Sequence, residues 1–359
     1  MDFRLDEDQR ALRAGMRDLL ARHGVPAARE PFGPAAEGGD GTVRALWREL
    51  GAAGFFALRL AEADGGVGLG LPEAALVFEE AGRALLPGPL VATHLAAGAV
   101  PGAAEGDTLV TAMDLGQARG DPDRDVLVEH LSTADVVVAV DGARVWTLPA
   151  SVVRSAARPI RSVDPGTPLA AVSLRSVPPS ATLSAMPSSA APSSVSRGPK
   201  EAGAAAGPGA AAGRFRAGAE LLSAAQQLGS ATRTVETAVE HARRRTQFGR
   251  SIGSFQAVQH LCAEMLVRVE VARAAVYAAA VLGAPEETAA AGLLADEAAV
   301  RNARDCLQVH GGMGFTWESD VHLHLKRAWV RAELWRTAAE AEEHLAAALL
   351  TGQDVGFDR

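Results

Sequence analysis

Aromatic residues are scarce in this chain: they make up 4% of its 359 residues, with a single tyrosine. The hydrophobic fraction is nevertheless 48%, so alanine, leucine and valine must supply most of the packing. Alanine is the strongest helix former among the amino acids. A chain of this length can bury a large core in about two or three domains, and its composition favours helices.

Cysteine is almost absent, with Cys262 and Cys306 as the two copies. Both lie in expected helices among apolar neighbours, which excludes a disulfide framework and predicts buried free thiols in a reducing compartment. The charged N-terminus has no apolar signal core, and no uninterrupted apolar run reaches membrane-spanning length. We therefore expect a soluble, cytoplasmic protein without a membrane partner.

Net positive charge is also missing, since the formal net charge is −8. Nucleic acid is thereby excluded as the main partner, because binding to its phosphates calls for a basic surface. A local basic cluster remains at residues 243–245. Metal binding is not expected either: His322 and His324 are two residues apart, and on a helix they point to different faces.

Within the first 176 residues, the hydrophobic pattern changes from helical to strand-like near residue 106. Residues 1–105 form a predicted N-terminal helical domain, with helical patterns at 4–23, 40–57 and from Pro72 to beyond Ala81. Residues 106–176 form a predicted small, reduced β domain, with strand candidates at 108–113, 135–140, 145–148, 152–153 and 169–174. Asp141-Gly142 indicates a hairpin between two of these strands.

The remainder of the chain divides in two. Residues 177–213 are rich in Pro, Ser, Ala and Gly, the composition of a disordered linker or loop. Residues 214–359 return to helical patterning, with predicted helices at 215–245, 254–282, 286–309, 318–329 and 331–350. The predicted fold class is therefore mostly α, with a C-terminal four-helix bundle after the β domain.

Two glycine-containing motifs lie at boundaries of these helices. The first is Arg245-Thr246-Gln247-Phe248-Gly249-Arg250-Ser251-Ile252-Gly253-Ser254-Phe255-Gln256, and the second is Gln308-Val309-His310-Gly311-Gly312-Met313-Gly314-Phe315. A guanidinium, free backbone N–H groups and a glycine that permits close approach suit a phosphate-bearing cofactor.

The domain order and both motifs resemble the acyl-CoA dehydrogenase family, over nearly the whole chain and most weakly at 106–213. In that family the two motifs bind the ADP half of FAD across a subunit interface. The resemblance therefore implies FAD as the cofactor and an acyl-CoA thioester as the substrate. By motif position it implies cofactor contacts from Arg245, Gln247, Phe248, Ile252, Phe255, Gln256, Gln308, Gly311, Gly312 and Thr337.

The catalytic base does not stand where much of this family has it. The family's glutamate, followed by Gly-Thr, corresponds here to Trp335-Arg336-Thr337, and an indole cannot remove a proton. Glu333 is two residues away and is expected to be a solvated charge. Some members place the base on the first helix of the bundle, which implies Glu220 in this chain. That carboxylate would be desolvated in its apolar helix.

A second departure lies in the middle domain. The family's Thr-Glu-Pro…Gly-Ser-Asp-like segment, which lines the flavin and substrate, corresponds to residues 111–120 and does not match. The whole pattern resembles the shorter subunit of actinobacterial heterotetrameric acyl-CoA dehydrogenases, a group associated with sterol side-chain breakdown. In these enzymes a degenerate subunit pairs with a complete one.

Three hypotheses remain open from the sequence. The chain is a catalytic acyl-CoA dehydrogenase with Glu220 as base, or a non-catalytic subunit that completes the FAD site of a partner chain, or a flavin-free oligomeric scaffold. The first two imply a homotetramer or heterotetramer. An electron-transfer flavoprotein and oxygen both remain candidate electron acceptors.

Overall fold

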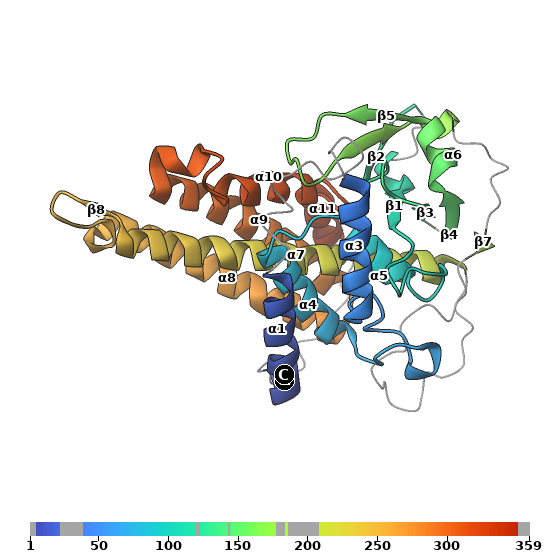
Figure 1. Cartoon of the computed structure of the whole chain (residues 1–359), viewed down its shortest axis with the longest axis horizontal. Helices are drawn as coiled ribbons and strands as arrows, with labels where there is room; N and C mark the ends of the chain where they lie inside the picture. Colours follow the sequence, from blue (N-terminus) through green and yellow to red (C-terminus); the bar gives the residue numbers. More distant parts are fainter. Residues whose placement is uncertain are drawn as a thin grey trace. The chain divides into compact units, whose positions relative to one another are not determined.

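The computed structural model describes residues 5–21, 39–118, 123–142, 144–176, 184–185 and 208–350. Most of them are helical, so the predicted mostly α class is confirmed (Figure 1). Residue contacts divide the chain into two compact units. Unit 1 contains residues 1–25, 75–86 and 220–359, and unit 2 contains residues 26–74 and 87–219. Segments of the first 105 residues thus occur in both units.

Unit 1 is built from long helices. They are α1 (Glu7–Leu20), the end of α4 (Leu71–Arg83), α7 (Pro208–Arg244) from Glu220 onward, α8 (Gln256–Leu282), α9 (Pro285–His310), α10 (Val321–Ala332) and α11 (Ala338–Leu350). Local chemistry explains their ends: Asp6 and Gln9 form a capping box for α1, and Gly283 ends α8 in the left-handed conformation. Pro285 then begins α9.

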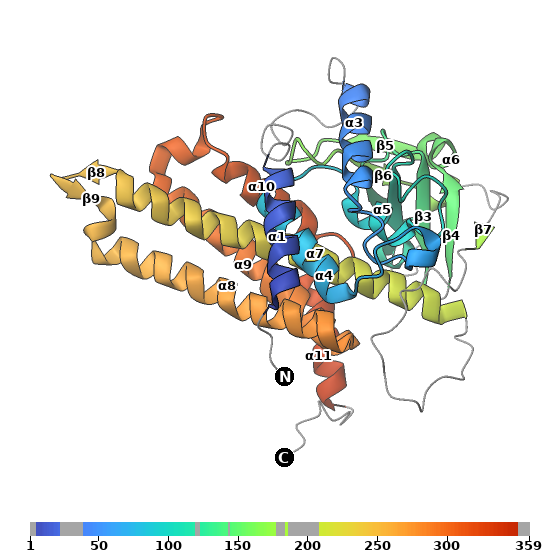
Figure 2. The same cartoon turned by 60° about the horizontal axis from the view of Figure 1, so that its bottom comes forward.

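A two-stranded hairpin, β8 (Thr246–Gln247) and β9 (Arg250–Ser251), connects α7 to α8. The hairpin lies at the tip of this helix pair in both views (Figure 2). It contains half of the first sequence motif. The second motif consists of the last three residues of α9 and of η6 (Gly311–Phe315).

Unit 2 carries the strands. One sheet has the order β1 (Val110–Asp114), β3 (Val136–Val140), β4 (Val145–Pro149) and β7 (Ser184–Ala185), with β1 parallel to β3 and the other pairs antiparallel. The second sheet has the order β2 (Val126–Glu129), β6 (Leu169–Val172) and β5 (Ala157–Ile160), all antiparallel. The predicted hairpin at Asp141-Gly142 is confirmed as the β3–β4 pair.

The core of unit 2 comes from the inward faces of these strands together with short helices. Met113, Val128, Val137 and Val172 belong to one buried cluster. The helical elements are α3 (Gly39–Ala52), η1 (Glu62–Asp64), α5 (Leu90–Ala96), η2 (Leu115–Ala118), α6 (Ala150–Ser155) and η3 (Leu174–Ser176). The ring of Trp47 in α3 packs 5.5 Å from that of Phe56, and both rings are buried, so these two aromatic residues contribute a large buried area to the core.

Several predicted boundaries were wrong. Residues 152–153 belong to helix α6, not to a strand, because the turn follows Pro149 and buries Val153 in the core cluster. The short strands β2 and β5 were not predicted. The predicted linker at 177–213 contains strand β7 and the first turns of α7, since Pro208 and the alanines after it favour a helix. Its residues 177–183 and 186–207 lie outside the described residues.

The last two helices also differ from the predicted ranges. The expected helix at 331–350 begins only at Ala338, because Trp335 has a φ of +62° and interrupts the helical backbone. No helix in the described ranges has both the length and the apolar character required to cross a membrane.

Candidate functional site

The β8–β9 turn displays an aromatic side chain in a strained conformation. Phe248 and Gly249 occupy the two-residue loop with φ angles of +53° and +78°, as a type I′ turn requires. Positive φ is common for glycine but costly for a bulky residue. The ring of Phe248 is 90% exposed, so no burial within the described chain offsets this cost. Backbone strain that holds an apolar ring in solvent is typical of a binding element.

The neighbouring residues of the first motif form a basic and aromatic surface. The Arg250 guanidinium lies 4.2 Å from the ring centroid of Phe255, whose ring is edge-on to that of Phe248 at 6.2 Å. Arg245, Gln247 and Gln256 are exposed. Ile252 is half-buried and packs against the hydrophobic cluster beneath. Of the predicted contacts in this motif, Ile252 is therefore the one whose side chain also stabilises the fold.

The second motif forms an open glycine turn. Helix α9 ends at His310, and Gly311 follows with a φ of +62°. A Cβ atom added to Gly311 or Gly312 would meet no atom of the described chain within 4 Å, so the space above this backbone is open to a ligand. Gln308, one turn before, is exposed.

Tertiary packing brings the two motifs together. The rings of His241, one turn before Arg245, and His310, directly before Gly311, are stacked with their centroids 4.0 Å apart. Beneath them a hydrophobic cluster joins α7, α8 and α9. Burial is the largest of the causes that lower the pKa of His241, followed by the charges of His310 and Arg245. An exposed guanidinium, three amides, an aromatic ring and an open glycine turn fit the ADP half of a dinucleotide.

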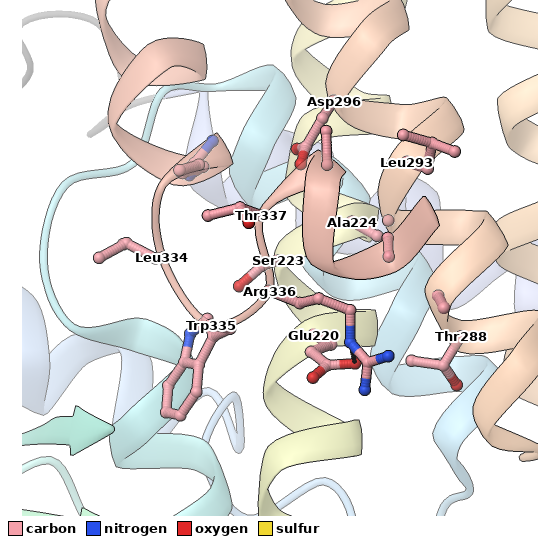
Figure 3. A pocket seen from close by; sticks show the side chains of 15 residues that line it. Glu220, Ser223, Ala224, Thr288, Leu293, Asp296, Leu334, Trp335, Arg336 and Thr337 are labelled. Carbon is pink, nitrogen blue, oxygen red and sulfur yellow. Dashed lines mark ion pairs between the residues drawn. The ribbon is translucent and has the colours of Figure 1, made fainter. Parts of the chain in front are cut away.

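The predicted base Glu220 lies in a separate pocket of unit 1 (Figure 3). This pocket is lined by Glu220, Ser223, Ala224, Thr288, Ala289, Gly292, Leu293, Asp296, Arg331, Leu334, Trp335, Arg336, Thr337, Ala338 and Ala341. Glu220 is buried, and its Oε2 is 3.1 Å from Nε of Arg336. The carboxylate is therefore held in an ion pair rather than in the purely apolar setting that the sequence suggested.

The loop before α11 carries the three residues that replace the family's glutamate, glycine and threonine. Arg336 extends toward Glu220, while Trp335 points to the other side of the loop (Figure 3). The Thr337 backbone N–H and hydroxyl each donate to Glu340 Oε2 at 2.9 Å, a cap for α11. The Thr337 hydroxyl thus already has a structural use. Glu333 is exposed, as expected for a solvated charge.

Asp296 is a titratable residue of this pocket that the sequence analysis missed. Its Oδ1 accepts a hydrogen bond from Nε2 of Gln227 at 2.8 Å. Burial raises the pKa of Asp296 to about 7, against the opposing effects of Gln227 and Arg331. The sequence did contain a signal for this residue. Asp296 lies three residues before Ala299 and seven before Ala303, so all three share one face of α9, and both alanines are fully buried.

The pocket and the two motifs are far apart along one helix. Glu220 and Arg244 are both in α7, and 24 residues at 1.5 Å per residue correspond to about 36 Å. This separation is beyond the reach of one extended dinucleotide. The motif residues and the pocket residues of a single chain therefore cannot serve the same cofactor molecule.

In unit 2, the segment at 111–120 uses its carboxylate internally. Asp114, at the end of β1, is buried and forms an ion pair with Arg216, and its Oδ1 also accepts from the Gly116 N–H at 3.0 Å. A Cβ at position 116 would overlap the Arg216 guanidinium, so a larger residue there would displace the partner of Asp114. Asp114, the acidic residue of this segment, is thus engaged in the ion pair with Arg216.

The remaining candidates have structural partners. His324 is buried and contacts Ser230 Oγ through Nδ1 at 2.7 Å, whereas His322 packs edge-on against Trp317. No group of three or more metal-ligating side chains occurs among the described residues. Cys262 and Cys306 are free thiols, the first half-buried and the second buried, and burial is the main cause that raises the pKa of Cys306 to about 12.

Comparison with known proteins supports the family resemblance. Residues 6–107 match the model of the acyl-CoA dehydrogenase N-terminal domain, and residues 212–344 match that of the C-terminal domain. The chain is 35% identical to acyl-CoA dehydrogenase IpdE2 of Mycobacterium tuberculosis, over 94% of this chain and 96% of that protein. It is 30% identical to acyl-CoA dehydrogenase IpdE2 of Mycolicibacterium smegmatis, over 92% and 95% of the two chains.

Solved structures share the fold at lower identity. The Tcur3481-Tcur3483 steroid ACAD G363A variant matches with a TM-score of 0.72 and 21% identity, over 97% of this chain and 99% of that chain. The ChsE4-ChsE5 complex from Mycobacterium tuberculosis matches with a TM-score of 0.69 and 22% identity, over 98% and 99%. With the two domain models and near full-length relatives in agreement, this chain belongs to the acyl-CoA dehydrogenase family of FAD-dependent oxidoreductases that act on acyl-CoA thioesters.

Proposed function

We propose that this chain is the non-catalytic subunit of a hetero-oligomeric acyl-CoA dehydrogenase and completes the FAD site of a partner chain. It would hold the ADP half of FAD through Arg245, Gln247, Phe248 and the Gln308–Gly312 turn. The partner chain would supply the base and the pocket for the acyl group. The observation that carries this proposal concerns the catalytic base. Trp335 stands where much of the family has its glutamate, and the alternative base Glu220 forms an ion pair with Arg336.

The chemistry explains why that observation matters. Dehydrogenation of an acyl-CoA needs a carboxylate that removes the α-proton, while FAD accepts a hydride from the β-carbon. A carboxylate in a buried ion pair with a guanidinium is stabilised in its charged form and is therefore a weaker base than an unpaired carboxylate in the same setting. Glu220 is in this position, with Arg336 Nε 3.1 Å away.

The geometry of the two regions supports a site completed between chains. The motif residues are about 36 Å from Glu220 along α7, so the ADP-binding surface must serve a cofactor whose reactive end lies elsewhere. Phe248 is displayed on the hairpin tip at 90% exposure. A strained, exposed ring of this kind is suited to insertion beside a ligand or chain that is not part of this subunit.

Related proteins point to the same arrangement. Two of the solved structures with this fold are assemblies named for two different chains, ChsE4-ChsE5 and Tcur3481-Tcur3483. The latter is a steroid ACAD by its name. We infer a heterotetramer for this chain and an acyl-CoA derived from a sterol side chain or another lipid as substrate. An electron-transfer flavoprotein is the acceptor that we would supply in assays.

Co-expression tests the proposal directly. The chain is purified alone and together with a complete acyl-CoA dehydrogenase chain from the same organism, and flavin absorbance and acyl-CoA-dependent acceptor reduction are measured. We expect a colourless chain alone and a yellow, active complex. Arg245→Ala should lower the FAD content of the complex about tenfold, because a charge-assisted contact to phosphate is lost. Arg243→Ala, an exposed arginine two residues earlier, is the matched control and should have no effect.

The Glu220→Gln variant separates the competing hypotheses. In the complex it should retain full activity, since the base belongs to the partner. A chain that is yellow and active alone, and loses activity on Glu220→Gln, would establish the catalytic hypothesis instead. Absence of flavin from both preparations would favour the scaffold.

A further inference from the structure

We propose that His241 and His310 are positioning residues that set the spacing between the two ADP-side motifs. This inference rests on the proposed half-site and adds two residues that are not among its predicted cofactor contacts. The structure stacks the two rings with a centroid distance of 4.0 Å and an interplanar angle of 27°. One ring belongs to α7 and the other to α9, so the stack joins the two helices that end in the two motifs.

Each histidine is linked directly to a predicted cofactor contact that follows it in the chain. The Arg245 backbone N–H donates to the His241 carbonyl at 2.8 Å, so Arg245 continues the helical turn that starts at His241. Gly311 directly follows His310 and its N–H bonds back to the last turn of α9. A lateral shift between the rings would therefore move the guanidinium relative to the glycine turn.

The His310 ring is fixed by contacts within its own helix. Its Nδ1 donates to the Cys306 carbonyl at 2.8 Å, and Cys306 Sγ lies 3.7 Å from the same nitrogen. Helix α9 thereby presents the face of this ring to His241. Burial and the nearby charges of His310 and Arg245 lower the pKa of His241, which favours the neutral form of its ring in the stack.

The hydrophobic cluster below the stack cannot set this spacing as sharply. Its members from α7 near the motif are alanines, Ala238 and Ala242, which face Leu307 and Val309 of α9 among others. Small side chains allow helices to slide relative to one another, whereas two flat rings in contact define a separation. A cofactor held by groups on two helices loses affinity when they shift by a fraction of an ångström.

Alanine and phenylalanine variants of both histidines provide the test. The probe is ADP, titrated calorimetrically into the complex with the partner chain after FAD removal. His241→Ala and His310→Ala should each raise the Kd for ADP about threefold to tenfold, the range that corresponds to loss of one aromatic pair. His241→Phe and His310→Phe keep a ring in place and should remain within about twofold of wild type. His344→Ala, in α11, is the control and should bind normally.

A double-mutant cycle distinguishes positioning from a general loss of stability. If the rings act through each other, the double alanine variant should bind ADP no more weakly than either single variant. Thermal unfolding of all variants is followed in parallel. Wild-type affinity in both alanine variants, or phenylalanine variants as weak as alanine, would overturn the inference.

Arg245→Ala distinguishes failure of this inference from failure of the proposed function. If Arg245→Ala weakens ADP binding and the histidine variants do not, the half-site stands and the stack has no positioning role. If Arg245→Ala also binds ADP with wild-type affinity, the half-site itself is wrong.

Discussion

At the scale of single residues, backbone strain lies at two places that the sequence had already singled out. Phe248 and Trp335 both have positive φ without being glycine, at +53° and +62°. The first displays its ring on the hairpin, and the second replaces the family's base. Strained conformations persist only where the surrounding structure enforces them. Under the proposed function, the first position belongs to the cofactor-binding surface and the second to the loop that lacks a catalytic base.

Asp296 gives a residue-scale prediction about pH. Burial raises its pKa from 3.8 to about 7, so between about pH 4 and pH 7 the folded state holds a proton that the unfolded chain releases. The free energy of unfolding should therefore decrease as pH rises through this window, by at most about 4 kcal/mol. Asp296→Asn should flatten the dependence in urea unfolding measured at pH 5 and pH 7.5.

The control for Asp296 is Glu297→Gln, on the same helix in a surface ion pair with Arg301. It should keep the wild-type pH dependence. Equal slopes for wild type and Asp296→Asn would contradict the assigned environment of Asp296.

At the scale of elements, the helices of unit 1 were predictable because their signals are local. Alanine-rich periodic patterns, Gly283, Pro285 and Gly311-Gly312 place α8 and α9 within two residues of their observed ends. The strands of unit 2 were harder, because β2 and β5 have four residues each and their pairing depends on distant partners. The adjacent valines Val152 and Val153 predict a strand, because β-branched residues favour β structure. The turn after Pro149 starts helix α6 at this place instead.

Close approach of α4 and α7 in unit 1 gives an element-scale prediction. A Cβ at Gly229 would overlap the Glu79 carbonyl oxygen, and one at Gly82 would overlap that of Gln226. Gly229→Ala should therefore destabilise the protein by about 1–3 kcal/mol or more, because the helices must separate. Gly15→Ala, in α1 with nothing within 4 Å, should instead stabilise by up to about 1 kcal/mol. Chemical denaturation of both variants checks this contrast, and similar shifts would contradict the packing.

At the scale of the whole molecule, helix α8 exposes apolar side chains that a monomer has no reason to present. Leu266, Val267 and Val271 are 50%, 62% and 48% exposed. Val267 and Val271 are four residues apart and therefore lie on one face of the helix. An exposed apolar surface of this kind is typical of a subunit interface, in agreement with the hetero-oligomer proposed above.

Val267→Lys should therefore disrupt assembly with the partner chain while the chain itself remains folded. A buried lysine without an ion-pair partner is costly at an interface. Light scattering coupled to size-exclusion chromatography should show loss of the tetramer, and circular dichroism should remain unchanged. Val163→Lys makes the same change at an exposed valine of unit 2, 51% accessible, and should leave the assembly intact. Tetramers in both variants would exclude α8 from the interface.

The sequence by itself determined the helical class, the motif positions and the missing glutamate, because periodicity, turn chemistry and residue identity are local properties. Only the tertiary structure decided that Glu220 meets Arg336, that Asp114 meets Arg216, and that His241 stacks on His310. Each of these pairs joins residues far apart in the chain, and a contact between them depends on how the helices and strands pack. The physical reason is that local patterns specify elements, whereas the charge and neighbours of a buried group are specified by packing.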